Sequence, residues 1–489
     1  MTEFLLILPE IFLALTLALV VAGEITYHGE DLRLITITAI LGLGAAFVQT
    51  LITYQYGATQ LFEHTLSIDG LSLFFKLIFI LLAGLSIFIA MNTKEVPRSR
   101  QAEYVALVLA SALGMCLAAS SADLLLAFLS LQFTNVLAYF LAGYGKRSIL
   151  SAEAAVKYMI FSAVAGALLL YGLAILFAHT QSLNIYEIHR ALVAHPLPRE
   201  VMLVVFMLTF LSFSFQFGAF PMYLWAPDVL EGSPTPAAAF LSISSRAVGF
   251  AVALRFFVVV FAQPALTGGQ WQVLGALDWT QVVAWVAGLT MITGSLLAFR
   301  QNSAKRMVGC LVVAESGYLL MGLLVLDEVG IAALLYNLVI QLFALMGTFY
   351  VLSFFFDEVG SDRLEDLRGM LRRAVPEAIC LVLFLLCLVG LPPTPGFIGK
   401  FTLIGVAIRH QWPLLAMTAV ATMALSSVAV ARLAYHLVGD FRKTEVTPAA
   451  PQVHRRMFLG GLISVMLVVG VFAEFLLDWT GKSLGFILW

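Results

Sequence analysis

Three charged side chains lie deep inside apolar segments of this 489-residue chain, and they could take part in proton chemistry: Lys400, Glu315 and Arg246. A charged side chain at the centre of a bilayer costs about 2.5–3.5 kcal/mol on insertion scales, so each needs a partner, water or a function. A buried lysine such as Lys400 can release its proton and act as a shuttle. Glu315 follows Arg306 by nine residues. This places Glu315 about two and a half helical turns into its segment, as a candidate proton relay. Arg246 stays protonated, so it can set an electric field but cannot release a proton.

Prolines interrupt two of the apolar segments close to these residues. Pro221 lies near the end of one segment, and Pro392 and Pro393 precede Lys400 in another. Free backbone groups within a membrane are tolerated only where protein or a water-filled cavity satisfies them. Broken helices at matching positions of two halves are typical of inverted repeats with an ion pathway near the membrane midplane. The breaks therefore predict two inverted repeats, and simple packing kinks are the alternative.

Other charged residues lie closer to the ends of their segments. Lys76 and Lys157 could extend their ammonium groups to the membrane surface, so anchoring is the better interpretation of both. Glu10 lies toward the outer end of the first apolar segment and is expected at the interface. These three residues are therefore left outside the predicted relay.

The composition indicates what kind of protein positions these residues. Hydrophobic residues make up 61% of the chain and charged residues 11%, against roughly one half and one quarter in soluble domains. Windows of about 19 residues predict membrane-spanning helices near 4–22, 33–54, 70–91, 103–119, 122–143, 154–178, 200–222, 235–262, 277–299, 306–325, 329–356, 376–400, 408–437 and 456–478. The sequence thus predicts an all-α polytopic membrane protein of about fourteen spans in contact with the lipid bilayer.

The charges and the cysteines exclude other classes of protein. A net charge of −2 gives no basic surface of the kind that a nucleic-acid-binding protein needs. The four cysteines show no C-x-x-C spacing and no two histidines are four residues apart, so no metal is expected. The first apolar segment has no basic region before it and no small-residue cleavage site after it, so it is expected to remain as the first span.

Lysine and arginine are distributed unequally between the two sets of connections. Most of them lie after the first span and after every second span that follows, whereas the opposite set holds only Arg190, Arg199 and Arg409. By the positive-inside rule the rich set is cytoplasmic, and an even number of spans places both termini on the periplasmic side. The predicted units are an N-terminal three-helix segment (1–100), a first repeat (101–262), a second repeat (277–437) and a C-terminal linker with the last span (438–489).

Four motifs resemble those of a known family. They are Asp-Gly-Leu-Ser-Leu-Phe-Phe-Lys at 69–76, Leu-Trp-Ala-Pro-Asp-Val-Leu-Glu-Gly-Ser-Pro-Thr-Pro at 224–236, Ala-Lys-Arg-Met at 304–307, and Gly390 to Lys400. Together they resemble subunit N of bacterial respiratory complex I, the proton-pumping NADH:quinone oxidoreductase, over essentially the whole chain. The second motif discriminates, because sister subunits M and L and the sodium/proton antiporter subunits usually carry a histidine-containing Leu-Pro-x-Ala-His sequence there.

The resemblance implies two inverted five-helix repeats with discontinuous helices and a chain of buried Glu and Lys residues that moves protons. It implies no cofactor in this chain, since NADH, flavin, iron–sulfur clusters and quinone are expected on partner subunits. The expected neighbours are membrane-arm subunits of the M and K types, in the bacterial inner membrane. The chain would then be a non-redox subunit of a proton-translocating enzyme, without a catalytic residue of its own.

Several relay positions depart from the family pattern. Gln132 falls where the family has its ion-pair glutamate, Gln216 replaces the broken-helix lysine, and Arg246 stands where a linking lysine is expected. Glu315 occupies a usual histidine position, whereas Lys400 matches. Glutamine cannot titrate and arginine effectively does not. The first-repeat relay is therefore expected to be impaired, so that any proton transfer is confined to Glu315 and Lys400.

Two other functions stay open. One is an antiporter-like subunit of a cation/proton antiporter or of a membrane hydrogenase, which copurifying partner subunits would distinguish. The other is a non-pumping scaffold subunit, which the replacements at Gln132, Gln216 and Arg246 favour. Retained pumping after Lys400→Ala would support the scaffold.

Overall fold

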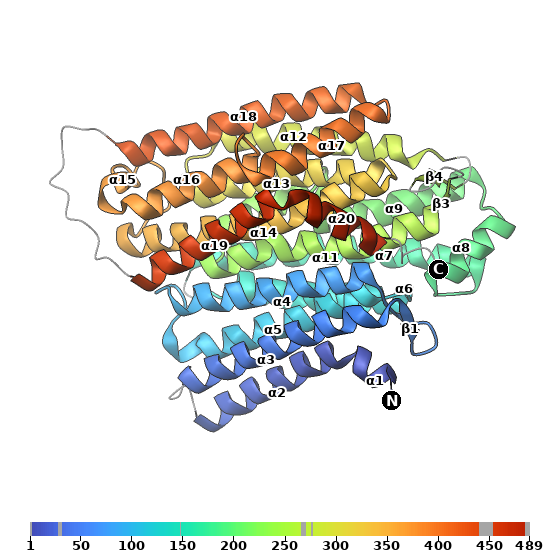
Figure 1. The fold of residues 1–489 in the computed structure, drawn as a ribbon, viewed down its shortest axis with the longest axis horizontal. Helices are drawn as coiled ribbons and strands as arrows, with labels where there is room; N and C mark the ends of the chain where they lie inside the picture. The colour runs from blue at the N-terminus through green and yellow to red at the C-terminus, as the bar shows by residue number, and fades with distance from the viewer. Residues whose placement is uncertain are drawn as a thin grey trace.

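The computed structural model describes residues 2–27, 32–146, 148–265, 270–274, 277–439 and 453–484. The long helices lie side by side in one bundle and run between its two ends (Figure 1). Within these residues, thirteen helices are long and apolar enough to cross a membrane. A further crossing is made by two shorter helices in succession, so the prediction of an all-α polytopic membrane protein is confirmed.

The helices group in chain order into an N-terminal segment, two sets of five crossings and a C-terminal pair. The N-terminal segment contains α1 (Thr2–Leu6), α2 (Leu8–Tyr27), α3 (Leu32–Thr53), η1 (Tyr54–Tyr56), the antiparallel strands β1 (Thr59–Leu61) and β2 (Leu66–Ile68), and α4 (Gly70–Met91). The first set contains η2 (Arg98–Arg100), α5 (Gln101–Ser120), α6 (Leu124–Ala142), α7 (Ile149–Thr180), α8 (Ile185–Ala194), α9 (Arg199–Phe217), η3 (Met222–Leu224), α10 (Trp225–Gly232) and α11 (Thr235–Phe261).

A second short hairpin, of β3 (Ala262–Pro264) and β4 (Trp271–Val273), follows the first set. The second set contains α12 (Trp279–Arg300), α13 (Ala304–Leu324), α14 (Glu328–Val359), α15 (Met370–Arg373), α16 (Val375–Val389), α17 (Pro395–Arg409) and α18 (Pro413–Val438). The chain ends with α19 (Val453–Val471) and α20 (Ala473–Leu484). In Figure 1, α1 and the end of α20 lie at the same end of the bundle as α8 and both hairpins, whereas α15 lies at the opposite end.

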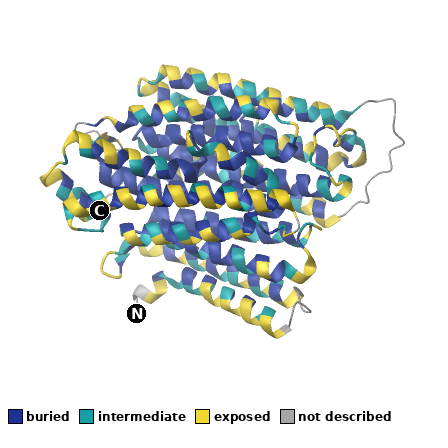
Figure 2. Ribbon diagram, turned by 180° about the vertical axis from the view of Figure 1, so that it is seen from behind, coloured by how far each residue is buried: buried dark blue, intermediate teal, exposed yellow. Residues whose placement is uncertain are grey.

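Burial separates central helices from peripheral ones. The membrane-crossing windows of α11 and α13 are 100% buried, whereas those of α2 and α3 are 28% buried. Figure 2 shows exposed residues along the outer helices and buried residues in the middle of the bundle. The outer side chains are themselves apolar, for example Leu19, Ile40 and Ile160, as expected for helices that face lipid. The central helices α11 and α13 are therefore where a charged group is shielded from both lipid and water.

The fourth crossing of each set is interrupted, as the prolines predict. In the first set the break between α9 and α10 contains Pro221, and in the second set the break between α16 and α17 contains Pro392 and Pro393. The helix before each break ends at a glycine with left-handed backbone, Gly218 (φ +65°) or Gly390 (φ +82°), a common way to end a helix. Because each set has five crossings, the second set traverses the bundle in the direction opposite to the first.

Side chains from neighbouring helices bind the backbone groups that the first break leaves free. Ser316 donates a hydrogen bond to the carbonyl oxygen of Phe217 at 2.5 Å, and Thr290 accepts one from the Phe220 amide at 2.9 Å. The Trp225 indole donates to the carbonyl oxygen of Phe215 at 3.0 Å. Protein therefore supplies the partners that such a break needs within a membrane.

The second break depends on a close approach of α17 to α16. A Cβ atom added at Gly396 would lie 1.8 Å from the carbonyl oxygen of Cys387, so Gly396→Ala must push the two half-helices apart. Such overpacking typically costs about 1–3 kcal/mol, and we expect a lower midpoint of thermal unfolding for the purified protein in detergent. Gly405→Ala on the same helix is the matched control, because nothing lies within 4 Å of its added Cβ. Equal midpoints for the two variants would contradict the close approach.

Candidate functional site

Glu315 of α13 and Lys400 of α17 form a buried ion pair beside the second break. Lys400 Nζ lies 2.5 Å from Glu315 Oε1, and each side chain is only 2% exposed. The ammonium group also donates to the carbonyl oxygen of Val389, the last residue of α16, at 2.8 Å. It lies 4.2 Å from the centre of the Tyr318 ring, which attracts a cation. Because α16 ends at the break, the carbonyl oxygen of Val389 is free to bind Lys400. In a continuous helix it would accept a backbone N–H instead.

Arg246 of α11 reaches this pair through Gln341 of α14. Its Nη1 donates to Gln341 Oε1 at 2.8 Å, and Gln341 Nε2 donates to Glu315 Oε2 at 3.2 Å. Arginine has only donors, so the amide oxygen of Gln341 must face Arg246 and its NH2 group must face Glu315. Glu315 therefore accepts from Gln341 on one oxygen and from Lys400 on the other.

The orientation of Gln341 also limits where a proton can go. The amide presents only N–H groups to Glu315, so it offers no acceptor for a proton on that side. Lys400, once deprotonated, has a lone pair that can accept one. The geometry therefore permits proton exchange between Glu315 and Lys400 and blocks it toward Arg246.

The corresponding region of the first set is polar but uncharged. Gln216 of α9 donates to Asn135 Oδ1 of α6 at 3.1 Å, and its own Oε1 accepts from Ser245 at 3.1 Å. Tyr158 of α7 donates to Asn135 Oδ1 at 3.3 Å. A cavity of about 10 Å³ lies against Asn135, Tyr158 and Ser245, which is room for about one water molecule. No member of this cluster can release a proton at neutral pH.

Gln132 does not join that cluster. Its side chain is half-buried and lies against α7, where a Cβ added at Gly166 would be 2.0 Å from Gln132 Nε2. In the described part of the chain, the hydrogen-bond partner of Gln216 on α6 is Asn135, one turn further along. Of the sequence-predicted residues, the structure thus brings together Lys400, Glu315 and Arg246, places Gln216 beside the helix that carries Arg246, and leaves Gln132 apart.

The expectation that the Lys76 ammonium group extends to the membrane surface is wrong, whereas Glu10 lies in the first turn of α2 but is buried against a neighbouring helix. Lys76 Nζ lies 2.6 Å from Glu10 Oε1, and the two side chains are 0% and 6% exposed. Distance from the end of a span does not determine which way a side chain points, and both of these face neighbouring helices. Lys157 is closer to expectation because its side chain is 36% exposed, although it pairs with Glu153 and Asp228 instead of extending freely.

Gln341 and Asn135 are functional candidates that the sequence alone did not single out. Both are uncharged, and each lies in a segment that reads as an ordinary apolar span. The available signal was a polar amide inside such a span, which on its own is more often a packing residue. Their importance follows from the partners that the fold gives them.

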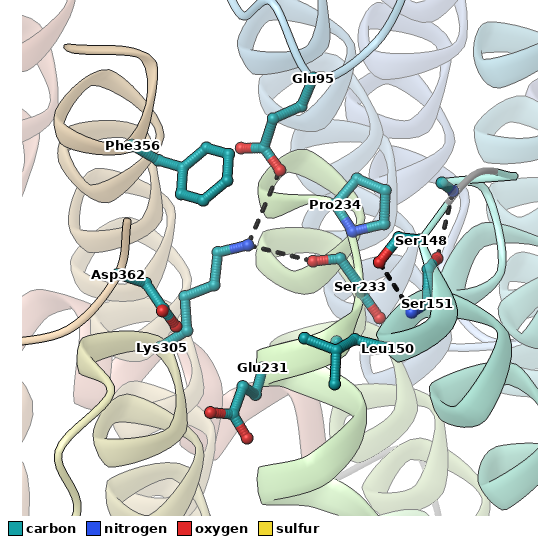
Figure 3. Close-up of a pocket in the computed structure, with 12 residues that line it drawn as sticks. Glu95, Ser148, Leu150, Ser151, Glu231, Ser233, Pro234, Lys305, Phe356 and Asp362 are labelled. Carbon is teal, nitrogen blue, oxygen red and sulfur yellow. Dashed lines mark hydrogen bonds and ion pairs between the residues drawn. The ribbon is translucent and has the colours of Figure 1, made fainter. Parts of the chain in front are cut away.

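A separate cavity of about 270 Å³, lined by both charged and apolar residues, opens at the lysine- and arginine-rich end of the bundle (Figure 3). Lys305 of α13 points into it, with Nζ 3.2 Å from the carbonyl oxygen of Ser233 and 3.7 Å from Glu95 Oε2. Glu95 Oε2 also accepts from the backbone N–H of Thr235, at the start of α11. Lys305 precedes Glu315 by ten residues on one helix, so the cavity lies about 15 Å from the ion pair along α13.

Comparisons with known proteins agree with this arrangement. A family model described as NADH:quinone oxidoreductase/Mrp antiporter, TM, matches residues 121–426. NADH-quinone oxidoreductase subunit N of Chlorobium chlorochromatii is 33% identical over 97% of this chain and 94% of its own. A chain of respiratory complex I from Thermus thermophilus superposes with a TM-score of 0.78 at 26% identity, covering 96% of this chain and 98% of its own. A chain of the Mrp complex from Dietzia sp. shares the fold, with a TM-score of 0.84 at 19% identity over 98% of this chain and 99% of its own.

Proposed function

The chain belongs to the NADH:quinone oxidoreductase/Mrp antiporter transmembrane family as a subunit N of complex I, and we propose that it moves protons through Glu315 and Lys400 of the second repeat. The observation that carries this proposal is the ion pair of 2.5 Å between two side chains that are each 2% exposed. Charged groups inside a membrane are costly and mark ion or proton pathways. The helix break beside Lys400 is the kind of feature that surrounds such a pathway.

The proposed step is a proton exchange within the pair. Lys400 gives a proton to Glu315, which leaves a neutral amine and a neutral carboxylic acid, and the reverse transfer restores the two charges. Both forms are neutral overall, so the pair can change state without adding net charge to the interior. Arg246, held through Gln341, contributes a fixed positive charge close to Glu315.

The first repeat (101–262) is proposed to take no part in this exchange, unlike the second (277–437). Gln132, Gln216 and Arg246 replace the titratable groups that the family pattern leads one to expect. The neutral bonds between Gln216, Asn135 and Ser245 support this view, because they fill the polar positions without a group that releases a proton.

The remaining parts of the proposal concern the assembly. Subunits of the M and K types are the proposed neighbours, and NADH, flavin, iron–sulfur clusters and quinone belong to partner subunits. This chain thus contributes to the enzyme without a redox site. The proposed location is the bacterial inner membrane, with both termini periplasmic and the cavity at Lys305 open to the cytoplasm. A cavity there supports the proposal, since water can bring protons to that end of α13.

The test is proton translocation by membranes that carry Lys400→Ala, with assembly checked by blotting. We expect the proton-to-electron ratio to fall while quinone reduction continues, because the remaining Glu315 has no partner for exchange. Lys157→Ala is the matched control, since this lysine is half-exposed and outside the pair.

A second variant is needed because Lys400→Ala leaves a buried carboxylate unpaired. Glu315→Gln with Lys400→Met removes both charges at once, so the complex should assemble and still show the lower ratio. An unchanged ratio in this assembled double variant would favour the non-pumping scaffold.

A further inference from the structure

A second buried Glu–Lys pair lies outside both repeats. Glu10 is in the first turn of α2, and Lys76 is in the second turn of α4. Their charged atoms are 2.6 Å apart, and the lysine side chain is fully buried. The pair has the same chemistry as Glu315 and Lys400, whose charged atoms are 2.5 Å apart.

The surroundings of this pair leave polar atoms unsatisfied. In the described part of the chain, Glu10 Oε2 has no hydrogen-bond partner, and Lys76 Nζ has none apart from its ion pair. Such unpaired buried groups are rare and call for an explanation, such as an ordered water or a chemical role. Inside a membrane the need is greater, because an ionisable residue there is costly.

The nearby pair of Asp69 and Arg255 shows what a purely structural pair looks like in this protein. Asp69 accepts hydrogen bonds from Ser67, from the Ser72 amide and from Arg255, so both carboxylate oxygens have partners. Arginine also cannot give up its proton under ordinary conditions. The pair of Glu10 and Lys76 differs on both points, since one oxygen of its carboxylate has no partner in the described part of the chain and its cation can titrate.

We propose that Glu10 and Lys76 form a second proton-exchange site of this chain, in its N-terminal helices. Lys76 passes a proton to Glu10 to give a neutral amine and a neutral acid, and water that binds Glu10 Oε2 takes the proton onward. The amine of Lys76 then takes up a proton from water, which restores the ion pair. Lys76 is the seventh residue of α4, so the site lies about 9 Å from the start of that helix, within reach of water from the end where α1 lies. This proposal rests on the proposed function, because it assumes a complex that translocates protons.

The competing role is a clamp that fixes α2 to α4, since a carboxylate in the first turn of a helix is favourable by itself. Single variants do not separate the roles, because either one leaves a buried charge unpaired. We therefore choose the neutral double variant Glu10→Gln with Lys76→Met, in the complete complex in native membranes. We expect normal assembly by blotting, continued quinone reduction and a lower proton-to-electron ratio. A ratio equal to that of the unmodified complex would overturn the proposal.

Asp69→Asn with Arg255→Met is the matched control, because it neutralises a neighbouring buried pair whose carboxylate oxygens both have partners and whose cation does not titrate. We expect this control to keep the full ratio, and a drop equal to that of the Glu10 and Lys76 variant would overturn the proposal as well. Should the double variant fail to assemble, Lys76→Arg provides the second measurement. An arginine can keep the ion pair with Glu10 but does not release its proton. A full proton-to-electron ratio with Lys76→Arg would therefore overturn the proposal.

The result also separates this site from the one at Lys400. Suppose that neutralising Glu315 and Lys400 lowers the proton-to-electron ratio, whereas neutralising Glu10 and Lys76 does not. The proposed function at Glu315 and Lys400 then stands, and only the proposal for Glu10 and Lys76 is overturned. If both double variants keep the full proton-to-electron ratio, neither pair takes part in proton translocation, and the chain is a non-pumping scaffold.

Discussion

Replacing Arg255 by methionine is expected to prevent most of the protein from accumulating in assembled form. Two guanidinium nitrogens bind the two oxygens of Asp69, at 2.7 and 2.8 Å, and the side chains are 2% and 0% exposed. Breaking a buried pair by removing one partner costs about 3–5 kcal/mol, because the other charge is left behind. Against a total stability of about 5–15 kcal/mol, such a loss is large. The measurement is the amount of assembled complex on native gels.

The position of this pair explains why the loss of Arg255 should affect several helices. Asp69 caps the N-terminus of α4 through the Ser72 amide, and Arg255 lies on the fully buried helix α11. Arg255 also donates to the carbonyl oxygen of Ala119 near the end of α5. Three helices therefore meet at one ion pair, and the unpaired Asp69 charge that the single variant leaves there disturbs the packing of all three.

Arg306→Met is the matched control for this prediction. The Arg306 side chain is 41% exposed, and it pairs with Asp228 at 2.8 Å and with Glu231 at 3.0 Å. Exposed ion pairs contribute about 0–1 kcal/mol, so this variant should assemble nearly normally. Normal assembly of Arg255→Met would show that Asp69 is hydrated in the protein, contrary to its burial in the structure.

The helices were predictable from the sequence because lipid imposes a simple requirement. A crossing needs a continuous apolar run of sufficient length, and the breaks at Pro221 and at Pro392 and Pro393 are marked by residues that cannot complete a helix. The pairing of Glu315 with Lys400 was equally accessible, since so few charged residues lie deep in apolar segments that each must be near another.

The individual partners were harder to predict, because hydropathy gives the depth of a residue and not the direction in which it points. Lys76 looks like a surface anchor by depth, yet its side chain is fully buried and pairs with Glu10 of α2. Gln341 and Asn135 have no charge to single them out, and only the packing of α14 and α6 gives them their roles. Direction around a helix depends on its neighbours, which one sequence does not reveal.

Gln216→Lys is expected to reduce assembly strongly, although it restores the residue type that the family pattern predicts. Gln216 is 4% exposed, and its described partners are the neutral Asn135 and Ser245. A lysine there would be a buried cation without an anion, which costs about 2.5–3.5 kcal/mol in a membrane. Gln281→Lys is the matched control, because Gln281 is exposed near the start of α12.

Adding Asn135→Asp should recover much of the assembly, because Asn135 Oδ1 lies 3.1 Å from Gln216 Nε2, so the new carboxylate can pair with the lysine. The double variant also tests the first repeat directly, since it restores a titratable pair where the chain now has two amides. Normal assembly of Gln216→Lys alone would contradict the prediction. It would mean that the cavity beside Asn135, with room for about one water molecule, hydrates the lysine, so that the first repeat has access to water that its neutral residues do not use.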